Sequence, residues 1–357
     1  MTPSTVTPPS RTPQKILFDV DTGIDDSLAL LYLLASPDEA DILAITCTSG
    51  NVPARAVALN NLNWLGLCKA PDIEVALGSE VPLLAPLMTT EETHGPQGIG
   101  YAELPDAGRS ISTRHATEVW IDAVRKHPGE IVGLVTGPLT NVALAVRLEP
   151  ELPRLLKRLV VMGGSFNYPG NTTPTSEWNI AVDPDAAKLV FDAFSGLPED
   201  RFPIIAGLNI TERIEMHPHH VAELARVSNS EPEELISPDD APGTLSKASN
   251  PVVRYLSDAV RFYMEFHLAH NQGHLAHIHD PFAAALAIHP EFATLRSATV
   301  DVELGGTLSR GTTIADWAGL WGREHNAAIA VDTDPAAFFT HFIERVGGLA
   351  RRVAETP

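Results

Sequence analysis

Short apolar runs alternate with segments of helical pattern along most of the chain, and this alternation restricts the possible folds more than any other feature. The strand-like runs cover residues 16–21, 42–48, 73–77, 131–136, 159–162 and 204–209. Helical patterns lie between them, at residues 25–35, 53–67, 113–127 and 183–194. Parallel strands that are buried on both faces have continuous apolar sequences, and each needs a crossover to the next. The pattern predicts an α/β fold with a mostly parallel central sheet flanked by helices.

The second half of the chain adds a long helix at residues 252–270, strands at 298–304 and 327–332, and a last helix at 335–346. A polar, Pro-rich segment, 228–251, is either a domain linker or a surface loop, and we favour the loop. We expect residues 15–350 to form one catalytic domain. Residues 1–14 are rich in Pro, Ser and Thr and are predicted to be a disordered tail.

Composition excludes several classes of partner. The chain has 357 residues, with 25 Lys and Arg against 45 Asp and Glu, so its formal net charge is −20. Such a surface repels nucleic acids and anionic membranes. The longest apolar run, residues 28–35, is too short to cross a bilayer. Two cysteines, Cys47 and Cys68, are too few for a disulfide scaffold and favour a cytoplasmic location.

Four carboxylates follow the first predicted strand, at Asp19, Asp21, Asp25 and Asp26. The carboxyl end of a parallel strand opens onto the crevice in which ligands bind, and Gly23 allows the backbone to turn there. Carboxylates this close repel one another unless a cation offsets them, and oxygen ligands suit Ca²⁺ or Mg²⁺. A preference for the positive end of the next helix accounts for only one pair of them.

Two other interpretations of this loop stay open at this point. The segment Phe-Asp-Val-Asp-Thr at residues 18–22 resembles the first motif of haloacid-dehalogenase-type phosphatases, which are Mg²⁺-dependent and would use Asp19 as the nucleophile. That family also needs a catalytic lysine, for which the chain offers no obvious candidate. The other alternative is a non-catalytic calcium- or ribose-binding protein, although the loop lacks the spacing of an EF-hand.

Further polar motifs stand at the ends of later strands. They are TSGN at 48–51, TGPLTN at 136–141, Asn171, Glu-Trp-Asn at 177–179 and His-Asp-Pro at 279–281. With these motifs and the DxDxGxDD pattern at 19–26, the sequence resembles the nucleoside hydrolases of the inosine-uridine-preferring type over residues 15–346. The resemblance implies a nucleoside hydrolase fold with a Rossmann-like core. It also implies Ca²⁺-dependent hydrolysis of the N-glycosidic bond of ribonucleosides, which releases free base and ribose.

The resemblance also implies roles for individual residues. The calcium ion would be held by Asp21, Asp26, the carbonyl oxygen of Thr136 and Asp280. Asp21 would activate the water, and His279 would assist the leaving base. Carboxylates near the sugar would stabilise the oxocarbenium-like transition state. The remaining substrate contacts would come from Asp25, Asn51, His94, Asn171, Glu177 and Asn179, with His94 near the base.

Base preference is less well specified. Purine-specific members of the family typically have Trp at the position of His279, so we expect a base-tolerant or pyrimidine-preferring enzyme that accepts uridine, inosine or cytidine. Tyr263, His267 or another residue of the long-helix region would contact the base. Because the family often assembles, we expect a homodimer or homotetramer.

Two features near this helix have competing interpretations. His267, His270, His274 and His277 are spaced three, four and three residues apart, as zinc ligands on a helix could be. Because Gly273 interrupts the helix and no HExxH pattern is present, we favour a mobile lid. Trp178 is expected to pack in the core rather than to stack on the ligand, since alternation in an extended segment would turn it away from its neighbours.

Overall fold

A nine-stranded sheet forms the centre of the molecule. The computed structural model describes residues 12–355, except residue 233. The sheet order is β10-β9-β11-β6-β5-β4-β1-β2-β3, and all neighbouring strands are parallel except the pairs β10–β9 and β9–β11, which are antiparallel. The predicted α/β fold with a mostly parallel sheet is therefore confirmed. The strands are β1 (Gln14–Val20), β2 (Ala40–Cys47), β3 (Glu74–Leu77), β4 (Ile131–Val135), β5 (Arg158–Met162), β6 (Ile204–Ala206), β9 (Ala293–Val302), β10 (Thr313–Asp316) and β11 (Ala327–Thr333).

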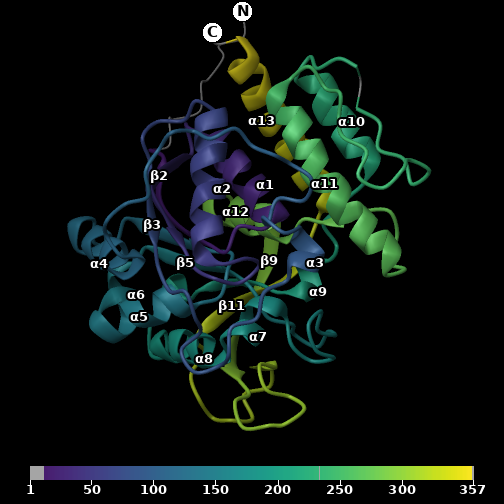
Figure 1. Cartoon of the computed structure of the whole chain (residues 1–357). Coiled ribbons are helices and arrows are strands. Elements are labelled where there is room, and N and C mark those ends of the chain that lie inside the picture. The colour runs from purple at the N-terminus through teal and green to yellow at the C-terminus, as the bar shows by residue number, and fades with distance from the viewer. Residues whose placement is uncertain (1–11, 233, 356–357) are drawn as a thin grey trace, which may run out of the picture.

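Helices cover both faces of the sheet and enclose two hydrophobic cores. In β1, Ile16, Phe18 and Val20 belong to one core, whereas Leu17 belongs to the other, as strand alternation requires. Figure 1 shows α10, α11 and α13 grouped apart from α4, α5 and α8. The first face carries α1 (Ile24–Leu34), α2 (Ala54–Leu67), α10 (Pro218–Val227), α11 (Pro251–Ala269), α12 (His279–Ile288) and α13 (Pro335–Glu355). The second carries α4 (Ala116–Lys126), α5 (Thr140–Leu148), α6 (Leu152–Leu155), α7 (Trp178–Val182) and α8 (Pro184–Ala193).

The strand order places a ligand crevice between β1 and β4. The six strands from β3 at one edge to β6 follow the order β3-β2-β1-β4-β5-β6, which is that of a dinucleotide-binding fold. The crossovers from β1 use α1 and α2 on one face, whereas those from β4 use α5 and α8 on the other. The chain therefore leaves β1 and β4 in opposite directions, and this divergence opens a crevice at their carboxyl ends.

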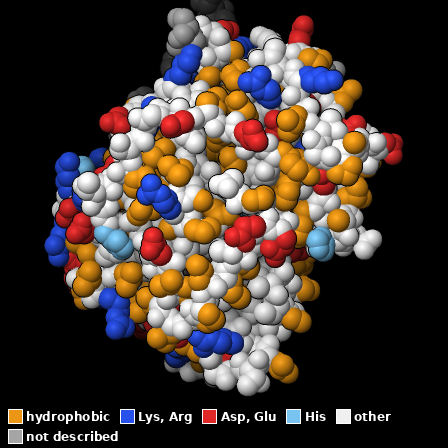
Figure 2. Space-filling model, in the orientation of Figure 1, with side chains coloured by type: hydrophobic (Ala, Val, Ile, Leu, Met, Phe, Trp, Pro, Cys, Tyr) orange, Lys and Arg blue, Asp and Glu red, His pale blue; other side chains and the backbone are white. Residues whose placement is uncertain are grey.

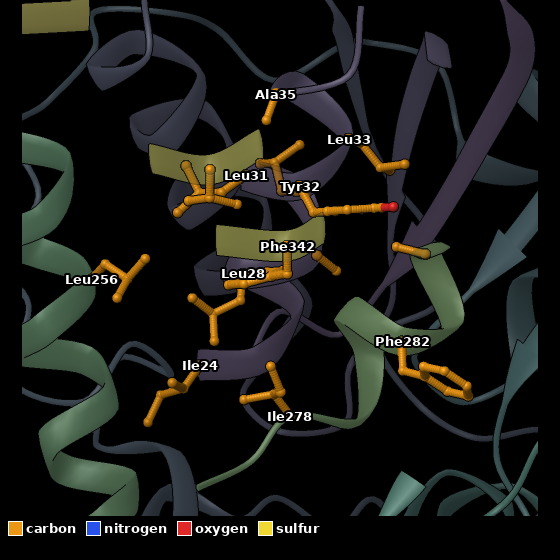
Figure 3. Close-up of a cluster of buried hydrophobic side chains, with 14 of the residues drawn as sticks. Ile24, Leu28, Leu31, Tyr32, Leu33, Ala35, Leu256, Ile278, Phe282 and Phe342 are labelled. Atoms are coloured by element: carbon orange, nitrogen blue, oxygen red, sulfur yellow. The ribbon is translucent and has the colours of Figure 1, made fainter. Parts of the chain in front are cut away.

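Helix α1 follows the acidic loop directly and is buried along nearly its whole length. Its first turn is capped by Asp26, whose Oδ2 accepts a hydrogen bond of 2.7 Å from the backbone N–H of Gly23. Figure 3 shows its side chains, among them Leu28 and Tyr32, packed between those of neighbouring helices, such as Phe282 of α12 and Phe342 of α13. A helix that is apolar on all sides belongs in a protein interior, so the loop before it is anchored in the core.

Several element boundaries differ from the prediction. β1 begins at Gln14, the last residue of the predicted tail, while residues 1–11 of that tail lie outside the described residues. β6 ends at Ala206 because the chain turns into the short helix α9 (Leu208–Thr211). α13 continues to Glu355, past Gly347. A Cβ at Gly347 would lie 2.6 Å from Cγ1 of Val227, so this glycine permits the close approach of α10 to α13.

The polar segment 228–250 lies against α11. Asp240 forms a 2.7 Å ion pair with Arg261, and the backbone N–H of Ser246 donates a 2.6 Å hydrogen bond to Asp258. Both partners lie on α11, and Arg261 is almost completely buried. The segment is therefore fixed to the helix that follows it, as a surface loop would be.

The surface is charged, and both cysteines are internal. On the face shown in Figure 2, acidic and basic side chains are interspersed among apolar ones. Across the part of the chain that the structure describes, no helix has the length and apolarity needed to span a bilayer. Cys47 and Cys68 are buried and free.

Replacing Phe282 by alanine tests the core beneath α12. The ring is fully buried, so Phe282→Ala is expected to lower the free energy of unfolding by about 3–5 kcal/mol. Leu308, which is 89% exposed, provides the control. Leu308→Ala is expected to change the free energy of unfolding by less than about 0.5 kcal/mol. Urea unfolding followed by circular dichroism measures both. Equal effects of the two substitutions would contradict the packing described.

Candidate active site

A cavity of about 410 Å³ opens at the carboxyl edge of the sheet. This volume lies in the range that small-molecule sites occupy. Of the predicted site residues, all except Asp21 and Asp26 line the cavity, and those two lie beneath it. The predicted residues in the lining are Asp25, Asn51, His94, Thr136, Asn171, Glu177, Asn179, His279 and Asp280.

Three buried carboxylates lie together at the floor of the cavity. Oxygen atoms of Asp25, Asp26 and Asp280 lie within 4.8 Å of one another. Asp25 and Asp26 are in the first turn of α1, and Asp280 is in the first turn of α12, so the positive ends of two helix dipoles meet the cluster. Burial nevertheless raises the pKa of Asp25 to about 7 and that of Asp26 to about 6, and it raises the pKa of Asp280 well above its usual range.

Mutual repulsion between the carboxylates adds to the cost of burying them. Besides burial, the charges of Asp25, Asp26 and Asp21 raise the pKa of Asp280. A divalent cation with a preference for oxygen would offset four negative charges in one place. The buried aspartate cluster is therefore consistent with a metal site.

Asp21 is held rigidly by backbone that approaches it closely. Its Oδ2 accepts a 2.8 Å hydrogen bond from the backbone N–H of Asn51, whereas its Oδ1 is buried without a hydrogen-bond partner. A Cβ at Gly50 would lie 2.1 Å from Oδ2, and one at Gly137 would lie 2.8 Å from the Asp21 nitrogen. Burial and the neighbouring Asp26 raise the pKa of Asp21 well above its usual range. The absence of a side chain at both glycines thus allows the backbone to pack closely against Asp21.

The end of β4 is tied to the acidic cluster. Thr136 Oγ1 donates a 2.5 Å hydrogen bond to Asp26, and the Thr136 carbonyl oxygen accepts a 2.7 Å hydrogen bond from Asn179 Nδ2. Asn179 Oδ1 is buried without a partner and is free to accept from a ligand. The Thr136 carbonyl retains a second lone pair.

Glu177 positions the short helix α7. Its carboxylate accepts hydrogen bonds from the backbone N–H groups of Gly164, Asn179 and Ile180, at 2.9, 2.8 and 3.0 Å. Burial raises the pKa of Glu177 to about 7, although these three donors favour its charged form. Asn171 is more exposed, and its Oδ1 accepts a 2.9 Å hydrogen bond from the backbone N–H of Trp178.

Aromatic and histidine side chains form the other end of the cavity. The ring of Tyr263 lies 5.2 Å from that of His94 and 4.5 Å from that of His267. Burial lowers the pKa of His94 to about 3 and that of His267 to about 4, so both rings are neutral near pH 7. His267 Nδ1 lies 2.8 Å from the Tyr263 carbonyl oxygen, which can only accept. The proton of the neutral ring is therefore on Nδ1, and Nε2 is an acceptor.

The ring of His279 is oriented by a residue of α9. His279 Nδ1 lies 2.8 Å from Thr211 Oγ1, and this hydroxyl donates a 3.2 Å hydrogen bond to the carbonyl oxygen of Gly207. Because the hydroxyl proton is used there, the hydroxyl oxygen accepts from Nδ1–H of His279. Nε2 of His279 is left for a ligand.

The structure contradicts the expectation for Trp178 and shows how the histidines near the end of the long helix are placed. Trp178 begins α7 instead of lying in an extended segment, and it lines the cavity half-buried, so the core-packing interpretation is wrong. Within residues 12–355 without 233, the two groups with metal-ligand spacing do not include His267, His270, His274 or His277. His267, His270 and His277 line the cavity individually.

Asp19 does not reach the cavity. Its Oδ2 accepts hydrogen bonds from Thr46 Oγ1, Trp120 Nε1 and Asn141 Nδ2, at 2.5, 3.3 and 3.0 Å. Trp120 and Asn141 lie on α4 and α5, on the face of the sheet away from α1. An inaccessible carboxylate with these donors is not a nucleophile, so the phosphatase interpretation is wrong.

Sequence reasoning missed part of the lining. The missed residues are Thr90, Glu92, Thr93, Thr172, Glu212, Phe266 and Gln272. Phe266 follows Tyr263 by three residues on α11, and this spacing places both on one helix face. Glu212 follows β6 and α9, and its carboxylate accepts a 2.7 Å hydrogen bond from Tyr168. Its position shortly after a parallel strand was the available signal.

A doubly covered parallel sheet with a carboxylate-floored cavity at its carboxyl edge defines an α/β enzyme architecture. The sequence profile of the inosine-uridine preferring nucleoside hydrolases matches residues 16–340. The pyrimidine-specific ribonucleoside hydrolase RihA of Salmonella paratyphi A is 33% identical over 332 residues, which cover 93% of this chain and 97% of RihA. RihA of Citrobacter koseri is 34% identical over the same lengths.

A solved structure shares the whole arrangement. The purine-preferring ribonucleoside hydrolase from Gardnerella vaginalis superimposes with a TM-score of 0.83 at 29% identity, covering 95% of this chain and all of that one. The chain therefore belongs to the inosine-uridine preferring nucleoside hydrolase family, and it is a ribonucleoside hydrolase. The predicted family, fold class and reaction class are confirmed, and the non-catalytic alternative is set aside.

Gly50→Ala tests the packing around Asp21. The added methyl group would overlap Asp21 Oδ2, so the carboxylate or the backbone must move by about 1 Å. We expect the rate of nucleoside hydrolysis to fall by about 100-fold with little loss of folded protein. Gly305→Ala is the matched control, since its nearest neighbour would be Glu303 Oε1 at 3.5 Å. Unchanged kcat/KM in Gly50→Ala would show that Asp21 tolerates displacement.

Proposed function

We propose that the enzyme hydrolyses ribonucleosides with the help of Ca²⁺, held by Asp21, Asp26, the Thr136 carbonyl oxygen and Asp280. The observation that carries this proposal is the buried carboxylate cluster at the floor of the cavity, in which Asp25 also takes part. The donors are hard oxygen atoms, and their number suits an ion that takes about six to eight such ligands. The unpartnered Asp21 Oδ1 supports a place for Asp21 among them.

A bound calcium ion would neutralise the carboxylates, orient the ribose hydroxyls and make a water molecule more acidic. Asp21 would accept the proton of the water molecule that attacks C1′ of the ribose. Its Oδ2 accepts a hydrogen bond from the Asn51 backbone N–H, which fixes the direction of the carboxylate. The C1′–N bond breaks, its electron pair goes to the leaving base, and the carboxylates stabilise the positive charge on the sugar.

Side chains around the floor of the cavity bind the ribose. Asn179 Oδ1, buried and unpartnered, accepts a hydrogen bond from a sugar hydroxyl. Asn51 and Asn171 offer both donors and acceptors, and Asp25 accepts from hydroxyls. Glu177 lines the same wall, where its three backbone donors fix the direction of the carboxylate.

His279 would contact the leaving base through Nε2, since Nδ1–H donates to Thr211, and it would assist the base as the imidazolium, whose Nε2–H gives its proton as the C1′–N bond breaks. His94, together with Tyr263 and His267, surrounds the base. Donors and acceptors on neutral rings suit the carbonyl and amino groups of pyrimidines as well as those of purines. We therefore propose a base-tolerant or pyrimidine-preferring enzyme, a preference that the pyrimidine-specific RihA relatives favour.

We also propose that residues 15–350 act as one catalytic domain, in the cytoplasm, as a homodimer or homotetramer. The family profile, which spans residues 16–340, supports the single unit. The two free cysteines suit a reducing compartment. Val81 and Leu84, which are 59% and 79% exposed on the loop after β3, offer apolar surface for self-association.

Asp21→Asn removes the proposed general base without changing the volume of the side chain. We expect kcat to fall by at least about 100-fold while the circular dichroism spectrum is retained. Asp41→Asn is the control, because Asp41 is exposed at the start of β2, away from the cavity. Substantial turnover by Asp21→Asn would remove Asp21 from the role of base.

A reducing-sugar assay over inosine, adenosine, guanosine, uridine and cytidine tests both metal and base. We expect ribose release with calcium, loss of release after chelation and recovery on adding calcium, with uridine and cytidine at least equal to the purines. Full activity in chelator would contradict the calcium proposal. Activity confined to purines would contradict the base preference alone.

A further inference from the structure

Three side chains with metal-binding atoms meet at the far end of the molecule from the cavity. Glu39 precedes β2, His289 follows α12, and His341 lies on α13. One ligand atom from each lies within 4.8 Å of the other two. The cluster stands at the amino edge of the sheet, and α12, about 15 Å long, separates it from Asp280.

The second nitrogen of each histidine is already held by an oxygen. His289 Nδ1 lies 3.2 Å from Glu291 Oε1, and His341 Nδ1 lies 2.9 Å from the hydroxyl of Tyr32. Hydrogen bonds of this kind fix the ring and leave Nε2 toward the ligand side, as they do for metal-bound histidines. Both rings also pack on Phe292, at 5.7 and 5.5 Å.

His289 Nε2 and Glu39 face each other without a hydrogen bond. The nitrogen is buried and lies 3.3 Å from Glu39 Oε1, but the approach does not have hydrogen-bond geometry. That separation is close to the distance of about 3.3 Å between two ligand atoms of a tetrahedral zinc ion. The pair is therefore spaced for an ion between the two atoms.

We propose that Glu39, His289 Nε2 and His341 Nε2 form a second metal site, selective for Zn²⁺, which is distinct from the catalytic centre. Two histidines and one glutamate are a donor set that zinc uses, with water in the fourth position. Borderline nitrogen ligands favour zinc over calcium, whereas the all-oxygen catalytic cluster has the opposite preference. The ion joins the α1–β2 loop, the end of α12 and α13.

Arg345 contacts two of the three proposed ligands. Its Nη2 lies 2.6 Å from Glu39 Oε2, and its Nε lies 3.4 Å from His341 Nε2. The Arg345 side chain is 30% exposed, so it is able to turn toward solvent when an ion enters. Burial and Arg345 lower the pKa of His341, which keeps the ring in the neutral form that binds metal.

The support beneath the site lies in the core. Tyr32, on the buried helix α1, stacks on Phe342 of α13 at 6.1 Å between ring centroids, and Figure 3 shows the two rings close together. This packing fixes the hydroxyl that orients His341. Zinc binding is therefore expected to raise the thermal stability of the enzyme without taking part in hydrolysis.

Zinc titration of the calcium-loaded enzyme against a chromophoric chelator tests the proposal, with cobalt absorption as a second readout. Glu39→Gln and His341→Gln are each expected to bind one ion fewer than the parent and to lose the zinc-dependent rise in Tm. Tyr32→Phe should weaken zinc binding by about tenfold. Arg345→Gln should tighten it, since a competing cation is removed. His325→Gln, at an exposed histidine, is the control and should match the parent.

Three results would overturn the proposal. The first is the same zinc stoichiometry and affinity in His341→Gln as in the parent, which would place the ion elsewhere, for example at the cavity histidines. The second is no zinc binding by the parent. The third is weaker zinc binding by Arg345→Gln than by the parent enzyme. This result would overturn the proposal even if His341→Gln fails to fold. Calcium-dependent hydrolysis should be unchanged in Arg345→Gln, so the two metal proposals fail separately.

Discussion

Burial of several carboxylates at one point is the constraint on which the rest of the structure depends. Asp21, Asp25, Asp26 and Asp280 are all within the protein, and burial is the largest cause of the raised pKa of each. The positive ends of α1 and α12 offset part of this cost, and hydrogen bonds from backbone and from Thr136 offset more. The negative charge that is not offset in this way can bind a metal ion and stabilise a cationic transition state.

The sheet makes this concentration of charge possible. Because the crossovers diverge at β1 and β4, the acidic loop, the end of β4 and the start of α12 reach one crevice from different parts of the chain. The glycines at positions 50 and 137 allow the backbone to approach Asp21 closely. The other end of the cavity has the opposite character, with neutral rings on α11 and beside α9. Charge therefore lies at the floor of the cavity, and uncharged polar rings line its other end.

The sequence predicted the inner strands and most motif residues of the site, because continuous apolar runs and polar strand ends are local signals. It missed α12, whose residues are all buried and therefore carry no helical periodicity, and the edge strand β10, which is short and partly exposed. Trp178 and Glu212 reach the cavity only because the chain forms short helices after β5 and β6. Such turns depend on tertiary contacts, which a local pattern does not contain.

The burial of α1 has a consequence for how the enzyme loses its site. Ten of the eleven residues of this helix are buried, and it packs against α12 and α13 in the main core. A helix placed so deeply opens only when the whole domain unfolds, so Asp25 and Asp26 keep their positions for as long as the domain is folded. The lifetime of the active site is thus the lifetime of the folded molecule.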